Sequence, residues 1–338
     1  MSKTILEVKQ LSKHFSRHRS LFSALNRRAD TIPAVDNVSF YLRENETMGL
    51  VGESGCGKTT VGRTILRLTK PTSGNIILDG RDITHLSDCE LRPLRKDMQL
   101  IFQDLDAGLN PKMRVQDILK EAVSVFERLS DAEVRVKSHM LLEQVNLKYS
   151  KLASYPSELS GGEKRRVGIA RVLAVGAKLI VADEPTSALD VSIQAQVVNL
   201  LRDLQKQLGL SYLFISHDLQ VVELMSHKVA VMYLGRIVEM GLTERIVGAA
   251  RHPYTYILWS SLVDKRSLEA TQSGKADRRT AWGVFDFERP ACGCRFAPRC
   301  PVYERLGHPP ECTDPDNEPQ LRDVGEGHQV ACHFPLGS

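Results

Sequence analysis

Residues 52–59 read Gly-Glu-Ser-Gly-Cys-Gly-Lys-Thr, a complete phosphate-loop motif of the form G-x-x-x-x-G-K-[ST]. The apolar stretch Thr47–Val51 precedes the loop and is typical of a strand end, whereas Thr60–Leu68 carries apolar residues at helical spacing. The motif requires this order of strand, loop and helix. The sequence therefore predicts an α/β fold in which backbone N–H groups of the loop surround phosphate oxygens at a helix N-terminus.

The residue types in the loop indicate the ligand. Lys58 places a positive charge near the β- and γ-phosphates of a nucleotide, and Thr59 offers its hydroxyl group to Mg²⁺. The motif thus predicts ATP and Mg²⁺ as ligands. We expect the nucleotide to contact the following residues: Gly52, Glu53, Ser54, Gly55, Cys56, Gly57, Lys58, Thr59 and Thr60.

The composition is that of an ordinary globular protein and excludes several classes of function. The 338 residues suffice for two domains, with 42% apolar and 25% charged residues. A net charge of +4 is too small to indicate nucleic acid as a partner. No run of apolar residues is long enough to span a membrane, and Met1–Lys9 lacks the apolar core of a secretory signal, so we expect a cytosolic protein.

Further strands and helices are expected to alternate along the chain, which indicates a mostly parallel sheet. The basic stretch 16–31 is interpreted as a solvated loop, with contact to a membrane surface or a partner as the alternative. Periodicity predicts strands at 5–8, 35–42, 75–78, 97–102, 180–182 and 212–215, two short strands within 229–239, and helices at 115–145, 164–174 and 191–207.

Two further motifs add groups that suit nucleotide hydrolysis. The apolar strand 179–182 ends in Asp183, which suits the Mg²⁺ shell, and Glu184, which could activate the attacking water. At 159–163 the chain reads Leu-Ser-Gly-Gly-Glu before a helical pattern, which is a second anion-binding arrangement. One nucleotide needs only one such site. We therefore expect a head-to-tail dimer in which Ser160, Gly161 and Gly162 of one subunit face the γ-phosphate held by the other.

With these motifs the sequence resembles an ATP-binding-cassette (ABC) transporter ATPase over roughly residues 5–260. The resemblance implies a phosphate-loop NTPase core with a mostly parallel sheet, an antiparallel β subdomain and an inserted α-helical subdomain at 104–157, all within a cassette spanning 1–260. Glu163 departs from the commoner Gln of the signature motif. By resemblance, Phe15 stacks on adenine, Gln103 reaches Mg²⁺ and water, Asp190 ends a loop at the dimer interface, and His217 lies near the γ-phosphate.

The mechanism that the resemblance implies is transfer of the γ-phosphoryl group to water. Lys58, Mg²⁺ and the partner's signature motif would stabilise charge, with Thr59, Gln103 and Asp183 at the metal and Glu184 and His217 as catalytic residues. ATP binding would close the dimer and hydrolysis would open it.

Five of the seven cysteines lie in the last 47 residues, after a polar linker at 267–280. Clustered cysteines in a reducing cytosol indicate metal binding more than disulfides. The segment 261–338 resembles the C-terminal extension of oligopeptide and dipeptide permease ATPases. That resemblance implies a [4Fe–4S] cluster, with zinc and then free thiols as alternatives, held by Cys294, Cys300, Cys312 and Cys332.

The resemblance therefore implies the ATPase subunit of an importer for dipeptides or oligopeptides, located on the cytoplasmic face of the membrane. Its expected partners are two membrane permease subunits, a second ABC ATPase and an external peptide-binding protein. The alternatives are an ATPase for nickel or another small solute, and a soluble ABC ATPase without a transport role.

Overall fold

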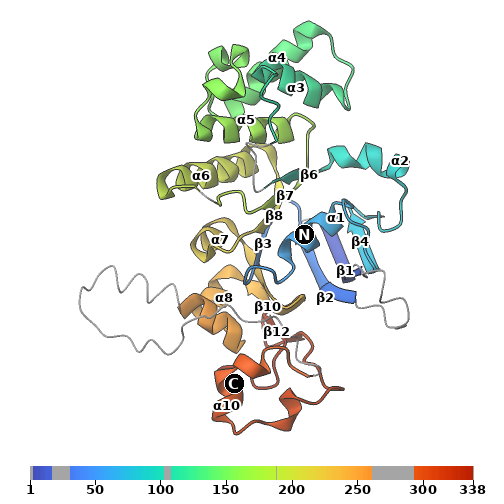
Figure 1. Cartoon of the computed structure of the whole chain (residues 1–338), viewed down its shortest axis with the longest axis vertical. Coiled ribbons are helices and arrows are strands. Elements are labelled where there is room, and N and C mark those ends of the chain that lie inside the picture. Colours follow the sequence, from blue (N-terminus) through green and yellow to red (C-terminus); the bar gives the residue numbers. More distant parts are fainter. Residues whose placement is uncertain (1–2, 17–30, 103–107, 188, 261–292, 338) are drawn as a thin grey trace, which may run out of the picture.

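A computed structural model describes residues 3–16, 31–102, 108–187, 189–260 and 293–337 of this chain (Figure 1). Two sheets and the helices around them build the molecule. Neither the basic stretch within 17–30 nor the linker within 261–292 belongs to the described residues. None of the helices that the structure describes has the length and hydropathy needed to cross a membrane.

The larger sheet is mostly parallel, in the order β11-β12-β10-β9-β3-β8-β7-β6. The pairs β6–β7, β7–β8, β8–β3 and β3–β9 are parallel, whereas the pairs that involve β10, β11 and β12 are antiparallel. The strands are β3 (Thr47–Val51), β6 (Met98–Ile101), β7 (Leu179–Asp183), β8 (Ser211–Ile215), β9 (Lys228–Tyr233), β10 (Arg236–Leu242), β11 (Arg322–Asp323) and β12 (Gln329–Val330).

The central strands are apolar throughout because both faces of the larger sheet are covered. Tyr212 and Phe214 of β8 belong to one hydrophobic cluster, and Leu213 and Ile215 belong to another on the opposite face. Successive side chains of a strand point to opposite faces, so an unbroken apolar run is what a doubly covered strand requires. All five residues of β8 are buried.

A four-stranded antiparallel sheet in the order β2-β1-β4-β5 covers one face of the core together with helix α1 (Lys58–Ile65). Figure 1 shows this smaller sheet to one side of β3. Strand β1 is longer than the sequence predicts and is broken by irregularities in its pairing with β2. The strands are β1 (Thr4–Ser16), β2 (Thr31–Arg43), β4 (Ser73–Leu78) and β5 (Arg81–Asp82).

Helices cover the other face of the larger sheet, and α3, α4 and α5 gather at the end far from the C-terminus (Figure 1). The α-helices are α2 (Asp88–Leu91), α3 (Val115–Ser124), α4 (Asp131–Gln144), α5 (Gly161–Leu173), α6 (Val191–Leu208), α7 (Leu219–Met225) and α8 (Thr243–Gly248), followed by a helix over 253–260. Short 3-10 turns are η2 (Arg92–Lys96), η3 (Tyr149–Ala153) and η4 (Pro156–Glu158).

The helical stretch expected at 115–145 is divided into α3 and α4. Ser130 ends the connection between them and caps α4, because its hydroxyl oxygen accepts from the N–H of Glu133 while the Glu133 carboxylate accepts from the N–H of Ser130. This reciprocal capping starts a new helix. Apart from the longer β1 and β2, the other predicted strands and helices are present with boundaries shifted by no more than a few residues.

The C-terminal segment, residues 293–337, folds against the larger sheet. It contains η5 (Ala297–Arg299), α10 (Pro301–Arg305), η6 (Pro310–Cys312), β11 and β12. Strand β12 pairs with β10, and Phe296 and Val302 join the main hydrophobic cluster. These apolar side chains of the segment are therefore buried against the cassette and do not form a separate core.

Candidate nucleotide site and cysteine cavity

The phosphate loop, Gly52–Thr59, connects the end of β3 to the start of α1. Its glycines are required by close backbone approach. A Cβ atom on Gly57, which has φ +109°, would lie 2.2 Å from the carbonyl oxygen of Ala34. Residues with a Cβ rarely adopt this conformation, and here they would also clash. A glycine at position 57 therefore lets the loop pass close to Ala34 as it enters α1.

Lys58 is buried, and its ammonium group lies within the loop. Its Nζ donates to the carbonyl oxygens of Gly52 at 2.8 Å and Glu53 at 2.9 Å. These bonds hold the positive charge against the backbone at the start of the loop. The thiol of Cys56 is also buried, and burial raises its pKa, so it stays a neutral packing group.

Thr59 and Asp183 form the second part of this site. The Thr59 hydroxyl donates to Asp183 Oδ1 at 3.0 Å, which joins the start of α1 to the end of β7. Burial raises the pKa of Asp183 despite this hydrogen bond. A hydroxyl and a carboxylate at this separation are ligands of the kind that Mg²⁺ takes in phosphate-loop enzymes, so the donor set fits that ion. Gln103, the third expected ligand, lies outside the described residues.

Glu184 follows β7 in a left-handed backbone conformation, with φ +48°. Its N–H donates to the carbonyl oxygen of Ile215 at 2.9 Å, and its Oε1 lies 3.1 Å from Nδ1 of His217. Non-glycine residues adopt this conformation infrequently, and those that do are concentrated at turns and functional sites. The structure thus brings together two predicted catalytic residues that are 33 positions apart (217 − 184).

The signature motif lies at the N-terminus of α5. Ser160 caps the helix, since its hydroxyl accepts from the N–H of Glu163 and the Glu163 carboxylate accepts from the N–H of Ser160 at 3.0 Å. Glu163 also pairs with Lys151 at 2.9 Å, which lowers the pKa of Glu163. The departure from Gln is therefore explained by a capping box with an added ion pair.

No hydrogen bond or ion pair joins this motif to the phosphate loop among the described residues of the chain. A Cβ atom on Gly161 or Gly162 would meet nothing within 4 Å. The surface above the start of α5 is therefore open, with the N–H groups of a helix N-terminus at its base.

Two further predicted contact residues lie on β1 and at the start of α6. Phe15 near the end of β1 is 43% exposed, and the ammonium group of Lys13 lies 5.0 Å from its ring centre. Asp190 caps α6 by accepting from the N–H of Ile193 at 2.9 Å. An exposed ring can stack on a base, whereas the Asp190 side chain already has a structural partner.

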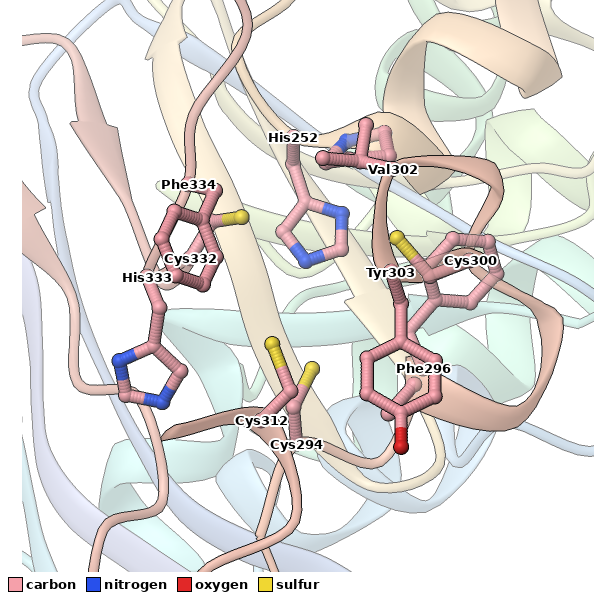
Figure 2. A pocket seen from close by; sticks show the side chains of 12 residues that line it. His252, Cys294, Phe296, Cys300, Val302, Tyr303, Cys312, Cys332, His333 and Phe334 are labelled. Carbon is pink, nitrogen blue, oxygen red and sulfur yellow. The ribbon is translucent and has the colours of Figure 1, made fainter. Parts of the chain in front are cut away.

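The four C-terminal cysteines line one small cavity of about 10 Å³, here called the cysteine cavity (Figure 2). Figure 2 shows their sulfur atoms arranged around the ring of His252. Burial raises the pKa of all four thiols, to about 11 for Cys312 and about 12 for Cys332. Within the described ranges, however, no group of three or more His, Cys, Asp or Glu side chains is arranged to hold a metal ion.

A buried carboxylate joins the C-terminal segment to β10, and the sequence analysis missed it. Glu239 is fully buried and accepts from the N–H groups of Arg251 and His252, and its Oε1 lies 2.6 Å from Nε2 of His328. The sequence did contain a signal for this site, since Glu239 is a charged residue within the apolar run of β10. A carboxylate buried in a strand requires hydrogen-bonding partners.

The chain matches the family described as "ABC transporter" over residues 35–187 and that described as "Oligopeptide/dipeptide transporter, C-terminal region" over residues 238–305. It is 44% identical over 333 residues to the oligopeptide transport ATP-binding protein AppF of Bacillus subtilis, in a match that covers 98% of this chain and 97% of AppF. The chain belongs to the ABC transporter ATPases of the oligopeptide/dipeptide permease family.

Other comparisons agree with this assignment of the ATPase. A putative peptide import ATP-binding protein of Brucella ovis is 45% identical, with 97% of each chain covered. Among solved structures, the dimeric cassette MJ0796 bound to ADP and Pi superposes with a TM-score of 0.61 at 26% identity, covering 71% of this chain and 99% of that one. CbiO1 from Clostridium perfringens gives a TM-score of 0.64 at 26% identity, covering 79% and 98%.

Proposed function

We propose that this ATPase couples ATP binding and hydrolysis to the import of dipeptides or oligopeptides. The observation that carries the proposal is the match to peptide-transport ATPases over nearly the whole chain, which includes the C-terminal segment as well as the cassette. Two permease subunits, a second ABC ATPase and an external peptide-binding protein would complete the transporter. The ATPase would lie against the cytoplasmic face of the membrane, as a cassette at 1–260 with a helical subdomain at 104–157 and an extension at 261–338.

The nucleotide site would form between two copies that face each other head to tail. The phosphate loop of one copy would hold the triphosphate, and Ser160, Gly161 and Gly162 of the other would cover the γ-phosphate. The open surface above the start of α5 supports this arrangement, because its helix N-terminus favours an anionic partner and its two glycines leave room for one.

Within that site each group of the chain has a role set by its position. Lys58 would exchange its carbonyl partners for phosphate oxygens, and Glu184 would take the proton of the attacking water while His217 orients it. Thr59, Asp183 and Gln103 would hold Mg²⁺, which neutralises developing phosphate charge. Phe15 would stack on adenine, and Asp190 would lie near the dimer interface.

A transport assay tests the proposed function. The variant Lys58→Ala is expressed in a strain that lacks the unaltered chain. Uptake of a labelled tripeptide is expected to stay at background, since the phosphates lose their fixed cation. The control Lys206→Ala, exposed on α6, is expected to restore uptake as the unaltered chain does. Restored nickel uptake without peptide uptake by the unaltered chain would instead support the small-solute alternative.

We also propose that the cysteine cavity holds a [4Fe–4S] cluster, with zinc as the second candidate. The donor types fit such a group, since four cysteine side chains line one cavity, although among the described residues they are not arranged around a common metal position. Thiols whose pKa is raised by burial become thiolates beside a cationic centre, so metal binding would reverse the effect of burial.

Metal analysis of anaerobically purified protein checks this proposal. We expect about four iron atoms per chain, brown colour and loss of both in Cys300→Ser. The control is Cys89→Ser, which removes an exposed thiol in α2 outside the cavity and should keep the iron. Stoichiometric zinc without iron would contradict the cluster and favour the second candidate.

A further inference from the structure

Two side chains outside the nucleotide motifs, Tyr254 and Arg299, bind Glu53 of the phosphate loop. We propose that Arg299 and Tyr254 are positioning residues for ATP binding, which act by holding Glu53 and, through it, Lys58. The inference rests on the nucleotide site proposed above. It adds a connection from the C-terminal segment to that site.

The first contact is a two-pronged ion pair. Arg299 Nη2 lies 2.9 Å from Glu53 Oε1, and Arg299 Nη1 donates to Glu53 Oε2 at 3.0 Å. Both side chains are largely shielded, with 22% and 26% exposed. The guanidinium group also lies 5.8 Å from the ring centre of Tyr233. A bidentate pair fixes the orientation of both groups as well as their separation, so it restrains the loop more than a single contact would.

The second contact reaches the backbone of the same residue. The N–H of Glu53 donates to the hydroxyl oxygen of Tyr254 at 3.0 Å. The Tyr254 side chain is fully buried, and its ring centre lies 4.7 Å from that of Tyr233 and 5.4 Å from that of Phe296. Packed aromatic rings of this kind have little freedom, so the hydroxyl group is a fixed point.

Glu53 transmits both contacts to the lysine of the loop. Its carbonyl oxygen accepts from Lys58 Nζ at 2.9 Å, so one residue is held at its carboxylate, its N–H and its carbonyl group. Without Arg299, Glu53 would be less firmly placed and its carboxylate would lose this ion pair. A carboxylate without its counter-charge beside the loop would repel the phosphates, which adds to the loss of positioning.

The same contacts lead directly to the cysteine cavity. Arg299 immediately precedes Cys300, and both Phe296 and His252 line the cavity (Figure 2). Phe296 also packs on Tyr254, with 5.4 Å between the ring centres. The N–H of Cys300 donates to the carbonyl oxygen of Ala297, which makes η5 one tight turn. The residues that shape the cavity are therefore continuous with those that hold Glu53.

Equilibrium binding of ATPγS to the full chain tests this inference. We expect Arg299→Ala to weaken binding about tenfold, which corresponds to about 1.4 kcal/mol. The affinity of Arg299→Lys for ATPγS should lie between that of the unaltered chain and that of Arg299→Ala, because lysine keeps the charge and loses the bidentate geometry. In a Glu53→Gln background, Arg299→Ala should have little further effect, since the residue through which Arg299 acts is already altered.

The matched control is Arg295→Ala. Arg295 also anchors the C-terminal segment, through Asp36, Glu318 and the carbonyl oxygen of Leu234, and within the described part of the chain it makes no hydrogen bond or ion pair with Glu53. We expect this variant to bind ATPγS like the unaltered chain. Equal weakening by both alanine variants, or undiminished binding by Arg299→Ala, would overturn the inference. If the unaltered chain failed to bind ATPγS, the proposed nucleotide site itself would be wrong.

Discussion

Replacing Glu184 by Gln is expected to reduce ATP turnover on the order of a hundredfold or more while ATP binding persists. The amide cannot accept the proton of the attacking water, whereas Lys58, Thr59 and the phosphate loop are unchanged. The dimer would therefore stay closed on bound ATP. Phosphate release measures turnover, and size-exclusion chromatography with ATP measures the trapped dimer.

The control for this variant is Glu223→Gln, which makes the same chemical change at an exposed position on α7. It should hydrolyse ATP at the rate of the unaltered chain and should not accumulate as a dimer. Normal ATP turnover by Glu184→Gln would show that Glu184 is not the base that accepts the proton of the attacking water. Loss of ATP binding would instead show that the side chain is needed to build the site.

Replacing Glu239 by Ala is expected to destabilise the docked C-terminal segment by about 3–5 kcal/mol, the range found when one partner of a buried pair is removed. The change leaves the N–H groups of Arg251 and His252 and the ring of His328 without their acceptor in a buried place. Urea unfolding measures the free energy of unfolding, and limited proteolysis shows whether residues 293–337 become accessible.

The exposed residue Glu244, at the start of α8, offers a matched substitution on the same stretch of chain. Glu244→Ala should change the free energy of unfolding by less than about 0.5 kcal/mol, as is usual for surface positions. Equal stability of the Glu239 and Glu244 variants would show that the buried carboxylate does not hold the segment in place.

Local patterns predicted much of the fold and where the nucleotide motifs lie in it, because each motif includes the turn or strand end that positions it. The phosphate loop between β3 and α1 and the acidic pair Asp183 and Glu184 at the end of β7 lie where the sequence predicts. The boundary between α3 and α4 was also readable, since Ser-Asp-Ala-Glu at 130–133 has the spacing of a capping box. Helical periodicity on both sides concealed it.

Contacts between distant parts of the chain could not be predicted in this way. Arg299 and Glu53 are separated by 246 positions, and no sequence motif of either residue predicts a contact with the other. The same is true of Glu239 and His328. Such pairs depend on how the C-terminal segment docks, which is a property of the assembled fold. Whether Gln103 reaches a metal stays a prediction, because it lies outside the described residues.

The pairing of β12 with β10 has a consequence for how the protein is made. Strand β12 covers the edge of β10, yet Gln329 follows Leu242 by 87 positions (329 − 242). At the usual pace of synthesis, about 5–20 residues per second, a ribosome needs roughly 4 to 17 s to make that stretch. During this interval the nascent sheet has an uncovered edge, the kind of surface on which strands of other chains can add. A late-made strand therefore covers this edge of β10, and a chain truncated before it would be exposed to aggregation and to quality-control proteases.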